Sequence, residues 1–279
     1  MKLKKTLSLL LAASMVMGMF ALTSCGKKNE PAVSGSSSST TTPSNLLEQI
    51  KADGVIVVGT NATNAPWESI DEKGNYVGYD MDLINEIASR MGVTVKIEDM
   101  AFDALVAAVQ TGKVNVAIAS MGAKEERKEK VDFTQMYHLQ MNVYLAQMDS
   151  DIAITDMEDI VNYKVGVQSG TLPDQYITNL VNDGKMKEDQ VSRYEAPENM
   201  ILDLEAGRID LVAGDKNQAK VFESMYNVKI IFECSFFGTG ENIAVPKNQP
   251  ELLNELDSIL DQLRSEGYLD QLAEKWEVD

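Results

Sequence analysis

The sequence predicts an α/β protein with two lobes, and three observations support this fold class. Short apolar segments that end in Gly, Ser or Asp alternate with segments whose apolar residues recur at helical spacing. The alternation runs through residues 45–143 and starts again over 146–239. A last extended segment and a helical tail have no sheet of their own, so we expect them to return to the first lobe.

In the first lobe, the apolar run VIVVGT is typical of a buried strand that ends in a loop. The segment from Tyr79 places Met81, Ile84 and Ile87 on one helical face, and Gly92 can end this helix in a left-handed conformation. The expected strands are residues 55–60, 94–100 and 114–120, and the expected helices are residues 79–92 and 101–113.

The second lobe repeats this pattern. Pro173 fits the first turn of a helix that starts at Leu172. The expected strands are residues 163–170 and 209–215, and the expected helices are residues 172–184, 198–208 and the tail from 250. The extended segments 142–147 and 242–247 would cross between the lobes as a two-strand hinge. We therefore assign residues 45–143 plus 240–279 to lobe 1 and residues 144–239 to lobe 2.

The expected binding site lies where these strands end. Open α/β sheets bind ligands beyond the carboxyl ends of their strands. Those ends carry the loops 59–67, 119–127, 167–171 and 213–215. Two lobes that present these loops to each other enclose one cleft.

The first residues predict export and a membrane anchor. Lysines 2, 4 and 5 precede an apolar run that is too short for a comfortable membrane span, so residues 1–24 are predicted to be a signal peptide. LTSC at 22–25 resembles the lipobox of bacterial lipoproteins, which implies a lipidated Cys25. Residues 25–44 are rich in Ser and Thr and predict a flexible tether. The alternative is a plain secreted protein with a stray thiol.

Charge and cysteine content exclude several classes of protein. The formal net charge is −18, and removal of the predicted signal peptide would leave −21. No basic stripe exists, so we expect no nucleic-acid partner. The acidity can favour cationic solutes, although solubility is the commoner reason for it. The only other cysteine, Cys234, predicts a small buried apolar side chain and no disulfide.

Several motifs together resemble one known family. They are VGTNATNAPWE, GYDMDL, the long run from MAFDALVAAVQTGK to EERKEKVDF, VGVQSGT, AGRIDLVAGD and LRSEGYLDQLAEKW. In order and spacing they are similar to the family 3 extracellular solute-binding proteins, the polar amino acid receptors of ABC importers. The resemblance covers essentially residues 50–279. It implies a periplasmic-binding-protein-like type II fold.

The resemblance assigns the clamp for the α-carboxylate of an amino acid. The family motif ends in an arginine that corresponds to Arg127, whose planar guanidinium suits a carboxylate. Ser120 occupies the hydroxyl position at the strand end. Gly122 and Lys124 stand where the family has hydroxyl residues. At Gly122 the backbone N–H can still bind, but a side-chain contact is lost. The Lys and Glu residues beside Arg127, Lys124 included, are expected to be a solvated face.

The second lobe is expected to complete the site. Asp215 matches the aspartate that receives the α-ammonium, and it also fits a helix N-cap before KNQAKVF. Thr171 and Ser169 in VQSGT fit the turn whose N–H groups bind the carboxylate at a helix N-terminus.

The pocket for the ligand side chain is less well defined by the motifs. Asn61 and Asn64 stand where the family often has an acidic and an aromatic residue, which disfavours a strictly cationic pocket. Trp67 and Phe102 are candidates for apolar walls, with core packing as the alternative. For Glu68, a surface position is favoured over contact with a cationic ligand.

We expect an extracytoplasmic binding component of an ABC importer, with no catalytic residue, cofactor or metal. The expected partners are an amino acid, the permease subunits and, through the lipid on Cys25, the outer face of the cell membrane. The protein is expected to be a monomer. A lipid-anchored sensing co-receptor is one alternative. An enzyme on the same scaffold is another, but the only histidine, His138, lies near the hinge without a triad or metal cluster.

We predict that Arg127→Ala abolishes nearly all amino acid binding and leaves the fold intact. Each charge-assisted hydrogen bond between the guanidinium and the ligand carboxylate contributes about 1.5–3 kcal/mol to binding, and the variant loses these bonds. Calorimetric titration measures the binding, and circular dichroism checks the fold. Micromolar binding by this variant would contradict the assignment.

Overall fold

The computed structural model describes residues 44–237 and 240–279. The predicted signal peptide, Cys25 and nearly all of the tether lie outside the described residues. In the described part, no helix has the length and apolar character needed to cross a membrane.

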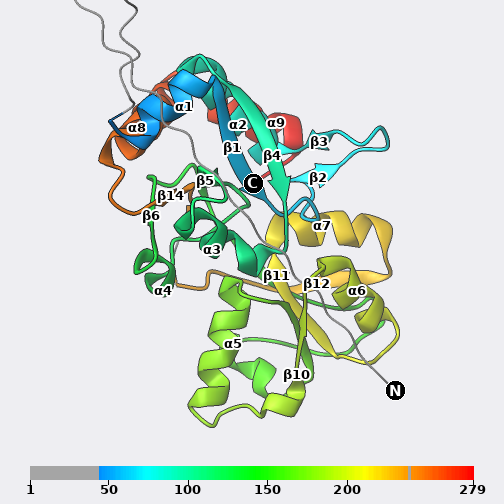
Figure 1. Ribbon diagram of the computed structural model, residues 1–279. Helices are drawn as coiled ribbons and strands as arrows, with labels where there is room; N and C mark the ends of the chain where they lie inside the picture. Colours follow the sequence, from blue (N-terminus) through cyan, green and yellow to red (C-terminus); the bar gives the residue numbers. More distant parts are fainter. Residues whose placement is uncertain (1–43, 238–239) are drawn as a thin grey trace, which may run out of the picture. The chain divides into compact units, whose positions relative to one another are not determined.

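The first lobe contains a five-stranded sheet in the order β4-β1-β5-β14-β6 (Figure 1). Strands β1, β4 and β5 are parallel, whereas β14 runs antiparallel to both of its neighbours. The return of β14 to this sheet was predicted, and its direction was not. The strands are β1 (Val55–Thr60), β4 (Thr94–Asp99), β5 (Val116–Ala117), β6 (Val131–Phe133) and β14 (Ala244–Pro246).

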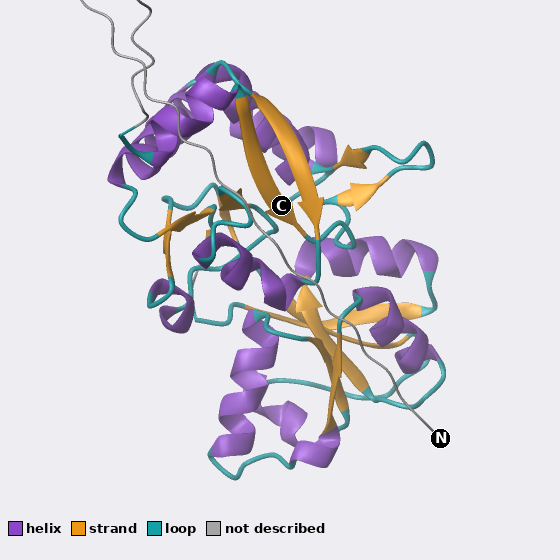
Figure 2. Ribbon diagram, in the orientation of Figure 1, coloured by secondary structure: helices purple, strands orange, loops and turns teal. Residues whose placement is uncertain are grey.

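Two helical layers bury this sheet. Alternate side chains of β1 point to opposite faces, so Ile56 and Val58 join one cluster while Val57 packs against the other. Helices α1, α2, α8 and α9 cover the first face, and α3 covers the second (Figure 2). These helices are α1 (Leu46–Asp53), α2 (Tyr79–Met91), α3 (Leu105–Gln110), α8 (Pro250–Ser265) and α9 (Tyr268–Trp276). The predicted α2 face is buried, and Gly92 ends the helix at φ 76°.

The second lobe contains a sheet in the order β10-β9-β11-β8-β12. Strands β9, β10 and β11 are parallel, and β8 is antiparallel to both β11 and β12. The strands are β8 (Asn142–Gln147), β9 (Val165–Gln168), β10 (Val191–Tyr194), β11 (Leu211–Asp215) and β12 (Val228–Cys234). Helix α5 (Leu172–Asn182) covers one face, and α6 (Pro197–Glu205) and α7 (Lys216–Met225) cover the other.

The chain crosses between the sheets twice. It leaves β6 through β7 (His138–Leu139) to reach β8, and it returns from β12 through β13 (Gly240–Glu241) to β14. Strands β7 and β13 pair with each other in antiparallel fashion. The two α/β lobes are therefore present, and two paired strands join them. The predicted hinge segments were wrong, however, because residues 142–147 form β8 of the second sheet and the segment 242–247 contains β14 of the first sheet. The residue limits assigned to the lobes above remain a prediction.

Some elements differ from the sequence expectation. The strand expected over 114–120 is reduced to β5, and the chain turns at Ser120, which has a φ of 46°. Strands β10 and β12 and the small hairpin of β2 (Ser69–Ile70) and β3 (Tyr76–Val77) were not predicted. Cys234 is buried as expected, and its burial raises the pKa of the thiol to about 12.

The start of α2 is packed against the loop that leads to the site. Gly78 has a φ of 135°, and a Cβ atom there would lie 2.1 Å from the carbonyl oxygen of Trp67. The hairpin and α2 can approach this loop only because residue 78 has no side chain.

We predict that Gly78→Ala lowers the free energy of unfolding by more than ~2 kcal/mol, because strain and a backbone clash add together. Gly74→Ala is the matched control, since its φ is 84° but nothing lies within 4 Å of the new Cβ. It should cost only about 1 kcal/mol. Denaturant unfolding measures both variants, and equal losses would contradict the packing argument.

Candidate functional site

A cavity between the lobes brings most of the predicted binding residues together. Eight of them line it: Asn61, Asn64, Phe102, Ser120, Gly122, Arg127, Thr171 and Asp215. Ser169 and Trp67 are not among the lining residues. Other lining residues that the sequence did not single out for binding include Gln140, Asn142, Gln168, Met200 and Gln218.

Arg127 is a buried cation that faces carbonyl groups. It lies on the short helix α4 (Glu125–Lys128) and is 5% exposed. Its Nη1 donates to the carbonyl of Gly122 at 2.6 Å, and its Nη2 donates to the carbonyl of Gly170 at 2.7 Å. The guanidinium lies 5.1 Å from the centre of the Phe102 ring, a cation–π contact. Burial lowers the pKa of Arg127 to about 10, so it stays charged at neutral pH.

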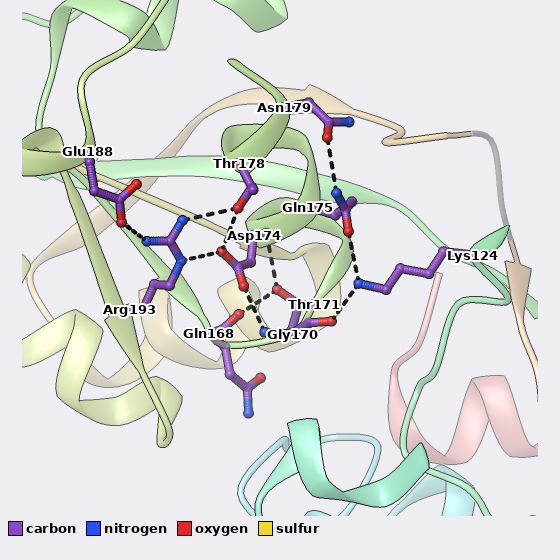
Figure 3. A network of polar contacts seen from close by, with 10 residues as sticks. All are labelled: Lys124, Gln168, Gly170, Thr171, Asp174, Gln175, Thr178, Asn179, Glu188 and Arg193. Atoms are coloured by element: carbon purple, nitrogen blue, oxygen red, sulfur yellow. Dashed lines mark hydrogen bonds and ion pairs between the residues drawn. The ribbon is translucent and has the colours of Figure 1, made fainter. Parts of the chain in front are cut away.

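Lys124 also reaches across to the second lobe. Its side chain is 12% exposed, and Nζ donates to the Gly170 carbonyl and to Oε1 of Gln175, both at 3.3 Å (Figure 3). Burial, and then the charge of Arg127, lower the pKa of Lys124. The expectation of a solvated face is therefore wrong for Lys124 in this arrangement, although Glu125 and Lys128 are exposed as expected.

The turn before α5 contributes a carbonyl rather than N–H groups to the contact with Arg127. The N–H of Ser169 donates to Tyr194 and that of Gly170 to the carboxylate of Asp174. Thr171 is the N-cap of α5, and its hydroxyl donates to the carbonyl of Gln168 at 2.7 Å (Figure 3). The N–H groups of Ser169 and Gly170 and the hydroxyl of Thr171 are therefore already bonded within the second lobe, which does not fit the predicted role of this turn as a set of free N–H donors.

Asp215 is the N-cap of α7 and keeps one carboxylate oxygen free of donors among the described residues. Its Oδ1 accepts the N–H of Gln218 at 2.9 Å, which confirms the N-cap of α7, and also accepts Nε1 of Trp67 at 3.0 Å. Its Oδ2 is buried and has no donor among the described residues. Burial raises the pKa of Asp215. One carboxylate oxygen thus holds the helix and the other is available to a cation.

Trp67 supports the site from behind the cavity. The ring is fully buried and packs edge-on against Tyr79 and His138, with centroids 5.3 and 5.0 Å away. Its indole N–H orients Asp215 of the other lobe. Trp67 is therefore a core residue that reaches the site only through Asp215.

The surface position favoured for Glu68 is wrong. The residue is fully buried, and both carboxylate oxygens lie in the interior without a donor among the described residues. The backbone N–H and carbonyl of Asn64 bond back to Glu68, and this tight turn aims the side chain at the cavity that Glu68 lines. No pattern in the sequence indicated the direction of this side chain, because the loop is not periodic.

Ser120 has no donor left for a ligand carboxylate. Its N–H donates to Oδ2 of Asp80 at 2.7 Å, and its hydroxyl donates to Oε1 of Glu241 at 2.7 Å. Only the lone pairs of Oγ remain, so at the cavity wall Ser120 can accept a hydrogen bond but not donate one. The predicted contact of its hydroxyl with a carboxylate therefore does not fit this geometry.

Glu68, Asp80 and Glu241 form a buried acidic cluster. Tyr137 donates its hydroxyl to Asp80 at 3.0 Å, and Nδ1 of His138 lies 3.6 Å from Glu241. Burial is the main reason that the pKa values of Glu68 and Glu241 are raised well above their usual range and that of Asp80 is raised to about 6. Within residues 44–237 and 240–279, no group of three His, Cys, Asp or Glu side chains has a geometry that could hold a metal ion.

The cavity lining has more free acceptors than free donors. Glu68 has two buried oxygens without a donor, and Gln140 and Asp215 have one each. Among the cavity-lining side chains described, Asn142 Nδ2 is the one buried donor without an acceptor. A group with several N–H donors and a positive charge satisfies this part of the lining best.

We predict that Ser120→Ala lowers the free energy of unfolding by about 1–3 kcal/mol, because Glu241 loses its donor in the interior. Ser120→Gly should cost roughly 1 kcal/mol less than Ser120→Ala, because glycine adopts the positive φ without strain. Denaturant titrations of both variants test this order. A larger loss for Ser120→Gly would show that the backbone at residue 120 is not strained.

Comparison with known proteins gives a consistent result. Residues 56–279 match the bacterial extracellular solute-binding proteins, family 3. A protein of Escherichia coli (strain K12) named putative ABC transporter arginine-binding protein 2 is 31% identical over 224 residues, which cover 78% of this chain and 88% of the relative.

Two solved structures extend the comparison to the fold. An ancestral arginine-binding protein bound to arginine is 35% identical, with a TM-score of 0.74 and coverage of 80% of this chain and 98% of the other. An ancestral amino-acid-binding protein described as a precursor of cyclohexadienyl dehydratase is 30% identical, with a TM-score of 0.74 and coverage of 83% and 99%. The chain has the two-lobed fold and the sequence features of these proteins, and it belongs to the bacterial extracellular solute-binding proteins of family 3.

Proposed function

We propose that this protein captures a free amino acid with a cationic side chain and delivers it to the permease of an ABC importer. The observation that carries the proposal is the composition of one cavity. It holds the guanidinium of Arg127, which is buried without an acidic partner among the described residues, together with carboxylate oxygens that have no donor. An amino acid with a cationic side chain has one negative and two positive groups to match.

Each of the three charged groups of the ligand has a partner in this arrangement. Arg127 receives the α-carboxylate, since a guanidinium keeps its charge when buried and pairs with both oxygens. Oδ2 of Asp215 receives the α-ammonium, which needs a counter-charge once it leaves water. Glu68 receives the side-chain cation, with Gln140 as a further acceptor and Phe102 as an apolar wall.

The choice of a cationic side chain depends on Glu68. A neutral ligand would offer Glu68 no counter-charge, so the site would lose the charge-assisted hydrogen bonds that a cationic side chain makes with the ionised carboxylate. The relative from E. coli and the ancestral structure carry arginine in their names, which supports the same class. Arginine, with five guanidinium N–H donors, fits the free acceptors best.

Binding and closure are coupled in this proposal. The bonds from Arg127 to Gly170 and from Trp67 to Asp215 join the two lobes. They form only when the lobes meet, and a ligand that contacts both lobes stabilises the same state. The permease would recognise that state.

Further parts of the proposal concern location. Cys25 would carry a lipid, and the tether would hold a monomeric domain at the outer face of the cell membrane. The family is extracellular by its description, which supports an extracytoplasmic site of action.

The proposal assigns binding without chemistry. One structural relative is described as a precursor of a dehydratase, so an enzyme is the alternative to test. His138, the only histidine, lies in β7 against Glu241 and is not among the residues that line the cavity. It is therefore poorly placed as a general acid or base for a ligand in the cavity.

A titration screen of the purified protein tests the proposed function. The protein is first unfolded and refolded to remove carried-over ligand. We expect arginine, lysine or ornithine to bind and raise the melting temperature, and we expect citrulline, the neutral isostere of arginine, to bind at least tenfold more weakly, a difference of about 1.4 kcal/mol. Binding of none of these amino acids, or conversion of a bound one to product, would contradict the proposal.

We also predict that Glu68→Gln removes most of the preference for arginine over citrulline, because the counter-charge is lost. Glu72→Gln is the control, since Glu72 is exposed on the hairpin near Glu68. It should keep the wild-type preference. A Glu68→Gln variant that still discriminates tenfold would place the side-chain cation elsewhere.

A further inference from the structure

We propose that the buried pair Glu68–Asp80 holds one proton in the ligand-free protein and that the side-chain cation of the ligand expels this proton to solvent. The inference rests on the proposed function and concerns how the same site is regulated. It would make uptake of the ligand an exchange of a cation for a proton.

The burial of the pair favours one bound proton. Glu68 lies on the loop after β1 and Asp80 in the first turn of α2, and neither has any exposed surface. The backbone N–H of Asp80 donates to the carbonyl of Trp67 at 3.0 Å, which places Asp80 beside Glu68, and three of the four carboxyl oxygens of the pair have no donor among the described residues. Two ionised carboxylates in this interior would repel each other without a compensating cation, so burial favours a proton on one of them.

The neighbours of the pair place that proton on Glu68. Oδ2 of Asp80 accepts the N–H of Ser120 and the hydroxyl of Tyr137, and both donors favour the ionised form of Asp80. Glu68 has no donor among the described residues. Its protonated carboxyl can donate to Asp80 and relieve the repulsion between the two groups.

The charged groups around the pair are mostly acidic. Glu241 on β13 raises the pKa of Glu68, and Asp215 on β11 raises that of Asp80. His138 on β7 faces Glu241 at 3.6 Å. Within residues 44–237 and 240–279, no Lys or Arg forms an ion pair with either member of the pair.

A ligand cation changes this balance. When a guanidinium or ammonium reaches Glu68, the ionised carboxylate becomes the favoured form, and the proton leaves for solvent. Because the free protein must lose a proton to bind, affinity falls as the pH falls. It rises with pH up to the apparent pKa of the ligand-free pair and then levels off. The limit is about a tenfold change in Kd per pH unit for each proton released.

Calorimetry of the purified protein with L-arginine tests the exchange. Titrations at one pH in buffers of different ionisation enthalpy give the number of protons released for each ligand bound. We expect release of up to about one proton on the acidic side of the apparent pKa, and a Kd that weakens steadily as the pH is lowered towards 5. The infrared band of a protonated carboxyl group should disappear when arginine binds.

Variants identify the source of the proton. Glu68→Gln should bind without releasing it, whereas the exposed control Glu72→Gln should release it as the wild type does. His138→Gln should also keep the release, since His138 faces Glu241 and not Glu68. Binding of arginine with a heat that does not depend on the buffer, and with a constant Kd between pH 5 and 8, would overturn the exchange but leave the proposed function intact. Absence of binding at every pH would overturn both.

Discussion

One carboxyl group, that of Asp80, joins three separate parts of the first lobe. Its Oδ2 accepts the N–H of Ser120, where the chain leaves β5 with a positive φ, and the hydroxyl of Tyr137, just before the hinge. A left-handed conformation costs a residue other than glycine about 1–2 kcal/mol, so the bend at Ser120 persists because these contacts hold it. The loop that carries Arg127 starts at this bend. Asp80 also lies beside Glu68, since its backbone N–H donates to the carbonyl of Trp67 at 3.0 Å, so the shape of the site and the charge of its wall both depend on this residue.

The residues that would hold the ligand also hold the lobes together. Arg127 donates to Gly170, Trp67 donates to Asp215, and Gln168 donates to Asn61 at 2.9 Å, each across the cleft. Such contacts do not select a ligand, but they set how readily the closed state is populated. Affinity therefore depends on closure as well as on direct contacts. A change at the cleft can alter the strength of binding without altering the choice of ligand.

The sequence predicted those parts of the protein that depend on local patterns. Apolar periodicity identified the helix from Tyr79, and the family motif identified Arg127 and Asp215, which line one cavity. It could not predict the burial of Glu68, because the direction of a loop side chain depends on a close approach between segments, here at a glycine. It also missed the inward position of Lys124, whose acceptors come from the other lobe. Contacts between distant segments leave no periodic pattern in the sequence.

The position of Trp67 gives the protein an intrinsic optical reporter. The chain has two tryptophans, and Trp276 bonds to Asp82 within the first lobe, whereas the indole of Trp67 bonds to Asp215 of the second. Separation of the lobes would break only the second bond and would expose the Trp67 indole N–H to water. The emission spectrum of the unlabelled protein therefore contains one signal that follows the distance between the lobes and one that does not.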